Sequence, residues 1–256
     1  MLNALGVLGQ PPAQNKDVPS KYMFNSVYRI WTCYGHRAKS NKNVGFLKIN
    51  PGSFFDGNTI GLSCQQQLLN NQGVLHNISV NSKCHKNDEL YEPFQWDVSN
   101  WFTDKNGTFA ENISTKQTGV FHDGRLTITQ NGVPIHREIN NRVATDWGLF
   151  AATQCFAPNY PYKPPKFQLL ENFQRLKGMQ TISYRDKTSL DWNGDKLELD
   201  CYQQIGHGVL PYEYYRDQYK RLVLVITGYR CYILDDNADA DFVFAVEKAR
   251  SRGKKR

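Results

Sequence analysis

The chain has 256 residues, of which 40% are hydrophobic and 13% aromatic, so it can bury a sizeable core in one large domain or two small ones. Its formal net charge is +7, but six positive charges lie between Lys248 and Arg256, and the rest of the chain sums to 7 − 6 = +1. A near-neutral body argues against a nucleic-acid partner, whereas the basic tail alone leaves docking to an anionic partner open. No apolar run is long enough to predict a transmembrane segment.

Residues 1–20 contain three prolines and are predicted to form an irregular leader that packs as a strap over the body. Its first ten residues carry no basic group and only a short apolar run, which does not match a signal peptide. We therefore expect a cytoplasmic protein if Met1 is the true start, and a cell-envelope or periplasmic one if a signal peptide is missing.

Residues 21–234 are predicted to form a single antiparallel β domain. Thr59 to Leu69 and Val74 to Cys84 flank a polar turn, and the second segment alternates with a period of two, which indicates a strand with one wet face. Its apolar face carries Val74, His76, Ile78, Val80 and Cys84.

A second hairpin is predicted at Asn131-Gly132, since this pair supplies the positive φ angles of a type I′ turn. Pro134, in the second arm, indicates that this arm lies at a sheet edge.

Two helices interrupt the strand pattern. Thr145 to Gln154 is predicted to form a short helix, capped by Thr145 or Asp146, that plugs or crosses the sheet. Residues 235–256 are predicted to form a C-terminal helix and basic tail, because acidic residues come first and basic residues last, as the helix dipole favours. Leu169 to Lys177 is ambiguous between helix and strand.

The stretch from Tyr202 to Leu234 is predicted to be a strand, turn and strand series around which the chain is organised. Leu222 to Ile226 is apolar on both faces and indicates a central strand. In the strand before it, Gln203 is predicted to fall on an otherwise apolar face, where a buried amide either braces the backbone or meets a ligand.

These elements predict a mainly β fold, a strongly bent antiparallel sheet or half-barrel with a short plugging helix and a C-terminal helical tail. A curved sheet of this kind predicts a non-enzymatic protein that binds a small apolar or amphipathic ligand on its concave face. The predicted ligand-binding residues are Gln203, Tyr202, Tyr212, Tyr214, Trp147 and Tyr229. Ordinary core packing is the alternative explanation for most of these aromatic residues.

A catalytic alternative is a hydrolase or lyase in which His207 acts as general acid or base, with Glu213 to orient it. His207 lies between Gly206 and Gly208, in the kind of loop that often carries functional side chains. No nucleophile motif or glycine-rich phosphate loop accompanies it, and we expect no cofactor.

We expect no metal, because Cys33 with His36 and the adjacent Cys84-His85 lack a second half at zinc spacing. The six cysteines are compatible both with three disulfides and with six buried thiols.

Several segments resemble an uncharacterised bacterial family with open antiparallel β half-barrels. From the first segment to the last, they extend over about two thirds of the chain. The most specific are Gln203 to Pro211 and Leu222 to Leu234; the others are Leu62 to Cys64, Val74 to Ser79 and Asp146 to Ala152. The half-barrel architecture resembles that of periplasmic lipid and lipoprotein carriers. The resemblance implies apolar ligand binding across the concave face and carries over no catalytic residues.

Overall fold

The computed structural model describes residues 25–33, 42–86, 88–157, 165–192 and 195–253, so the predicted leader at residues 1–20 lies outside the described residues. Fifteen strands in these ranges form one sheet. The first eight strands are β1 (Ser26–Thr32), β2 (Asn43–Asp56), β3 (Thr59–Leu69), β4 (Leu75–His85), β5 (Pro93–Thr103), β6 (Thr115–His122), β7 (Arg125–Gln130) and β8 (Val133–Glu138). The remaining seven are β9 (Arg142–Thr145), β10 (Lys166–Glu171), β11 (Arg175–Trp192), β12 (Asp195–Gly206), β13 (Tyr212–Asp217), β14 (Leu222–Ile226) and β15 (Arg230–Leu234). The described helices are η3 (Glu111–Ile113), α1 (Asp146–Cys155) and α2 (Ala238–Gly253).

The sheet consists of two runs of neighbouring strands joined in its middle. Its order is β8-β7-β6-β5-β4-β3-β2-β1-β15-β14-β13-β12-β11-β10-β9, and β1 and β15 pair antiparallel to connect the two runs. Every pair is antiparallel except β9 with β10. The sheet is therefore open, with β8 and β9 as its two edges.

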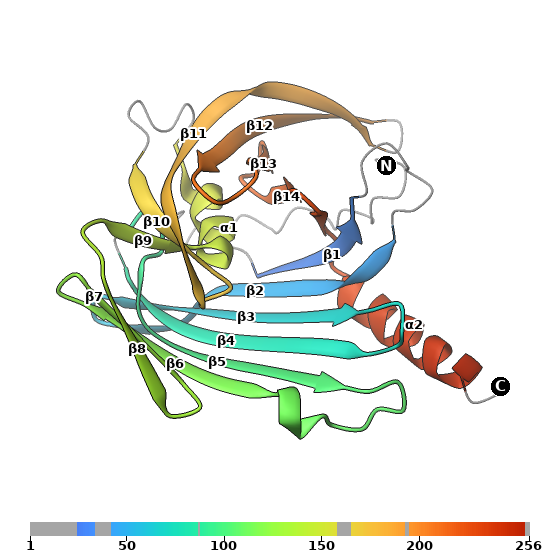
Figure 1. The fold of residues 1–256 in the computed structure, drawn as a ribbon. Helices are drawn as coiled ribbons and strands as arrows, with labels where there is room; N and C mark the ends of the chain where they lie inside the picture. The colour runs from blue at the N-terminus through green and yellow to red at the C-terminus, as the bar shows by residue number, and fades with distance from the viewer. Residues whose placement is uncertain (1–24, 34–41, 87, 158–164, 193–194, 254–256) are drawn as a thin grey trace.

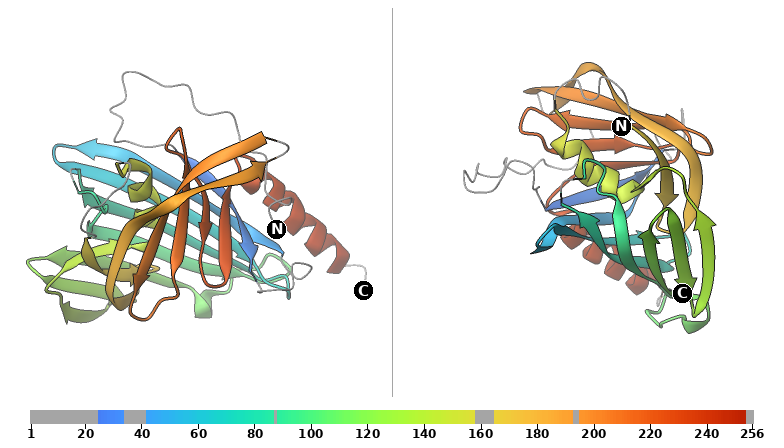
Figure 2. Two further views of the ribbon diagram at one scale, coloured as in Figure 1. Left: turned by 90° about the horizontal axis from the view of Figure 1, so that it is seen from above. Right: turned by 90° about the vertical axis from the view of Figure 1, so that its left-hand side faces the viewer.

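The two runs curve toward one another around α1. Figure 1 shows α1 enclosed between β2 to β5 below and the arch of β11 to β13 above, whereas α2 lies outside the sheet. Figure 2 shows the orange strands crossing over the blue and cyan ones. The predicted bent antiparallel sheet, the plugging helix and the C-terminal helix are thereby confirmed.

Both predicted hairpins are present. Asn131 and Gly132 have φ angles of 50° and 84° between β7 and β8, and β8, which contains Pro134, is an edge strand. The ambiguous segment from Leu169 to Lys177 is two strands joined by a turn at Asn172 and Phe173.

Helix α1 is buried on all sides, in keeping with its mostly apolar sequence. Thr145 caps it by accepting a hydrogen bond from the Gly148 backbone N–H at 2.9 Å, and every residue from Trp147 to Gln154 is buried. The Phe150 ring packs edge-on against Tyr28, Tyr214 and Tyr232, with centroid distances of 5.4, 6.1 and 5.2 Å. The helix thus forms the centre of the core, on the concave face of the sheet.

The C-terminus of α1 is held by a buried arginine. Arg216, on β13, is only 2% exposed, and its Nη1 donates to the carbonyl oxygens of Thr153 at 3.2 Å and Phe156 at 2.5 Å. Its Nη2 donates to Tyr202 Oη at 2.7 Å and to Asp200 Oδ2 at 3.3 Å. A cation at this end of the helix is favoured by the helix dipole, and Asp200 balances its charge.

The β10–β11 turn inserts an aromatic ring beside the other end of α1. Phe173 is fully buried, with its ring centroid 5.9 Å from that of Trp96 and 6.3 Å from that of Trp147. Its carbonyl oxygen accepts a hydrogen bond from Gln117 Nε2 on β6, so the turn connects strands from opposite halves of the sheet. Asn172 and Phe173 both have positive φ angles, 50° and 59°, which is an unfavourable conformation for a bulky residue.

Helix α2 packs against the convex face. Phe242 and Val246 form a small second core with Phe46 and Leu75, separate from the core around α1. The Arg29 guanidinium binds the Asp235 carboxylate at 2.6 Å, at the start of this segment. Of the two described α-helices, α1 is therefore the one that packs on the concave face.

Candidate ligand-binding site

The middle of the concave face is filled by side chains. Tyr202 and Tyr214 are fully buried and Trp147 is 2% exposed, all of them around α1. Burial raises the pKa of Tyr202 to about 12, against the opposing effect of the Arg216 guanidinium. These three predicted ligand-binding residues thus lie in the core.

Gln203 and Glu213 lie on the opposite, convex face. They are paired across β12 and β13, whereas their neighbours Tyr202 and Tyr214 contact the groups around α1. Glu213 accepts a hydrogen bond from Tyr215 Oη at 2.6 Å and forms an ion pair with Arg185.

The fully buried glutamine of this strand is Gln204, on the concave side. Its Oε1 accepts from Tyr214 Oη at 2.7 Å, and its Nε2 donates to Gln180 Oε1 at 3.4 Å. This amide braces the sheet, the role that the sequence argument allowed for Gln203.

His207 is exposed on the turn after β12. Its carbonyl oxygen accepts from Gln180 Nε2 at 2.9 Å, and within the described part of the chain its imidazole has no carboxylate partner. The carboxylate of Glu213 is occupied by Arg185 and Tyr215. The described residues therefore do not bring the two predicted catalytic groups together.

An open pocket lies on the concave face at the end formed by β1, β15 and the β3–β4 hairpin. It has a volume of about 520 Å³, and we name it the Tyr229 pocket after the residue at its rim, which is 72% exposed. The lining residues are Thr32, Val44, Leu68, Leu69, Asn70, Val74, His76, Phe102, Tyr229 and Arg230. The volume falls in the range of small-molecule sites, about 300–1,000 Å³, and most of the wall is apolar.

Two polar side chains give this pocket its chemistry. His76 Nε2 lies 2.6 Å from Asn100 Oδ1, and the imidazole stacks on the Phe102 ring at 4.4 Å between centroids. Burial lowers the pKa of His76, the hydrogen bond to Asn100 opposes this, and the Arg230 guanidinium lowers the pKa further. The imidazole is therefore neutral at pH 7 and Arg230 is the cation.

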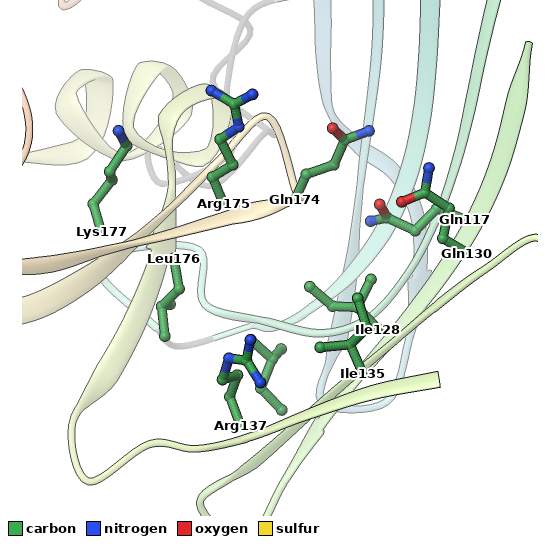
Figure 3. Close-up of a pocket in the computed structure, with 10 residues that line it drawn as sticks. Gln117, Ile128, Gln130, Ile135, Arg137, Gln174, Arg175, Leu176 and Lys177 are labelled. Carbon is green, nitrogen blue, oxygen red and sulfur yellow. The ribbon is translucent and has the colours of Figure 1, made fainter. Parts of the chain in front are cut away.

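A second cavity, of about 430 Å³, lies where β7 and β8 face the start of β11. We name it the Gln117 cavity. Figure 3 shows the Leu176 side chain directed toward Arg137, whereas Arg175 and Lys177 extend from the opposite side of the same strand. Gln117 is 3% exposed, and its Oε1 has no hydrogen-bond partner among the described residues. Exposed strand β8 contributes Ile135 and Arg137 to the wall of this cavity.

Of the predicted ligand-binding residues, Tyr229 lines the Tyr229 pocket, and Tyr212 is half-buried on the concave face near it. Sequence reasoning missed His76, Phe102 and Arg230. The strand pattern that places His76 on the apolar face with Ile78 and Val80 was a usable signal, because a titratable group on such a face needs an explanation. Arg230 carried no comparable signal, since its neighbours on β1 and β4 are distant in sequence.

The described residues contain no group of three or more histidine, cysteine, aspartate or glutamate side chains arranged to hold a metal ion. All six cysteines are free thiols. No helix in the described ranges has the length and apolar character needed to cross a membrane.

Comparison with known proteins shows a similar fold in a solved structure. No protein-family model matches the chain, and no curated protein matches it. Among solved structures, the chain is similar to a β-barrel-like protein of the domain of unknown function DUF1849 from Brucella abortus, with a TM-score of 0.50 and 6% identity over 83% of this chain and 97% of that one. At this identity the match shows the fold alone, a mainly β, barrel-like but open sheet.

Proposed function

We propose that the chain is a non-catalytic protein that binds a small apolar or amphipathic ligand in the Tyr229 pocket. The observation that supports this most directly is an open pocket of about 520 Å³ whose wall is mostly apolar and whose polar groups are few. Water in such a pocket contacts apolar side chains such as Val44, Leu68 and Phe102, so an apolar ligand gains free energy by displacing it.

The pocket has rigid walls on the side of the core. Leu68 belongs to β3, which pairs along its length with β2 and β4, and Arg230 begins β15 in the middle of the sheet. Tyr232, two residues along β15, packs against Phe150 of α1. A site formed by paired strands and anchored to the plug is preorganised, which lowers the entropic cost of binding.

A neutral fluorescent probe, N-phenyl-1-naphthylamine, tests the proposal by titration into the purified chain. We expect saturable binding to the native protein and at least roughly tenfold weaker binding to Leu68→Trp, in which the indole fills the pocket. Val74→Trp, at the pocket edge, is a second filling variant, and Ile135→Trp in the Gln117 cavity is the matched control.

Circular dichroism checks that each variant is folded. No saturable binding by the native protein, or equal binding by both folded filling variants and the native protein, would contradict the proposal. Loss of binding only in Ile135→Trp would move the site to the Gln117 cavity.

A further inference from the structure

Arg230 sets the charge of the Tyr229 pocket. It pairs with Thr32 across β1 and β15, and its side chain lies on the same face as Tyr232, whose ring contacts α1. The residue is half-buried and lines the pocket beside apolar side chains. The guanidinium is therefore partly withdrawn from water.

The other buried or half-buried arginines in or next to the strands of this sheet are matched by carboxylates. Arg216 binds Asp200 at 3.3 Å, Arg221 binds Asp217 at 2.7 Å and Arg142 binds Asp88 at 2.5 Å. Among the described residues, no carboxylate lies within ion-pair distance of Arg230. Arg230 also lies close enough to the phenols of Tyr232 and Tyr212 for its charge to lower their pKa values. Burial raises these pKa values more strongly, so both phenols are neutral and supply no negative charge.

A half-buried cation without a counter-ion is costly unless something else neutralises it. The nearby imidazole of His76, whose Nε2 contacts the side-chain oxygen Oδ1 of Asn100, is neutral and therefore supplies no negative charge. The pocket thus holds one uncompensated positive charge at one point of an apolar wall. A complementary ligand carries one negative charge and an apolar chain.

We propose that the ligand of the Tyr229 pocket is an anionic amphiphile, a carboxylate head with a hydrocarbon chain, whose head binds the Arg230 guanidinium. The inference rests on the proposed function and adds the class of ligand. An arginine fork matches the two oxygens of a carboxylate. The chain then lies along Val44, Leu68 and Phe102, which face the same pocket.

The test compares ligands that have the same ten-carbon chain and different heads. Decanoate and 1-decanol are titrated against the native protein by displacement of N-phenyl-1-naphthylamine. We expect decanoate to bind roughly tenfold more tightly or better, since a charge-assisted hydrogen bond in a partly buried site contributes at that level. Arg230→Gln is expected to remove this preference by weakening decanoate binding roughly tenfold.

Charge reversal provides a second, positive readout. Arg230→Glu is expected to bind decyltrimethylammonium more tightly than decanoate, the reverse of the native order. Arg175→Glu, in the Gln117 cavity, is the matched control and is expected to keep the native order.

The outcomes separate the two proposals. If the native protein binds the neutral probe but shows equal affinity for decanoate and decanol, the charge inference is wrong and ligand binding stands. If decanoate is preferred and only Arg175→Glu changes that preference, the anion site lies in the Gln117 cavity and the inference is overturned. If neither the probe nor either ten-carbon ligand binds, the proposed function fails, and the inference fails with it.

Discussion

Phe173 provides a sharp test of how the two halves of the sheet are connected. Its ring is fully buried against Trp96 and Trp147, and its backbone φ is +59°. Replacing a buried phenylalanine by alanine costs about 3–5 kcal/mol through lost burial and the cavity left behind. Alanine would keep the unfavourable left-handed backbone, whereas glycine adopts it freely and avoids about 1 kcal/mol or more of strain.

We therefore expect Phe173→Gly to be more stable than Phe173→Ala by about 1 kcal/mol, although both are less stable than the native protein. The order is the reverse of that for an extended residue. Phe167 is also fully buried, but it lies within β10, and there glycine is expected to be the worse replacement by about 0.5–1 kcal/mol.

Urea unfolding followed by tryptophan fluorescence measures both pairs, because Trp96 and Trp147 report directly on the Phe173 environment. The reasoning fails if Phe173→Gly is less stable than Phe173→Ala. It also fails if both variants unfold at the native midpoint, since the ring would then not connect the two halves.

Three further predictions concern titration and thiols. The pKa of His76, measured by NMR titration, is expected below 6.5 in the native protein without ligand. It is expected to rise in Arg230→Gln or when decanoate binds. An unchanged pKa in both cases would show that the Arg230 charge does not act on His76. Burial raises the pKa of Asp146 from 3.8 to about 7, so the folded chain binds more protons than the unfolded chain between those values. Stability should then fall as pH rises through this window, and Asp146→Asn should flatten the dependence of the unfolding midpoint on pH; an identical slope in both proteins would contradict this. The thiols of Cys33 and Cys231 contact one another, so oxidised glutathione is expected to form one disulfide, a loss of about two mass units that Cys33→Ser abolishes.

Much of the sheet could be predicted because its local signals agree with one another. The Asn131-Gly132 turn has the positive φ angles that its residues favour, and Thr145 caps the predicted helix. The turn at Asn172 and Phe173 could not be predicted in the same way. Phenylalanine is not a turn residue, and its left-handed conformation is held by contacts with residues distant in sequence.

The site was harder to predict than the fold, because both faces of several strands are buried. Leu199 and Cys201 are buried on one face of β12, and Tyr202 and Gln204 are buried on the other. A period-two pattern identifies the faces of a strand but cannot say which of two apolar faces is concave. The sequence argument consequently placed Gln203 with the apolar set and could not distinguish core tyrosines from pocket tyrosines.

The relative lengths of helix and strands explain why a site remains at the end of the concave face. Helix α1 has 10 residues, so it is about 15 Å long. Strands β3 and β4 have 11 residues each, or about 37 Å. Even a plug laid lengthwise would leave more than half of each strand uncovered, and the Tyr229 pocket lies at the uncovered end next to the β3–β4 hairpin. Arg216 holds the C-terminus of α1 against β13, so the plug cannot slide to cover either end without breaking its buried hydrogen bonds. The same contact that completes the core therefore keeps α1 away from the Tyr229 pocket.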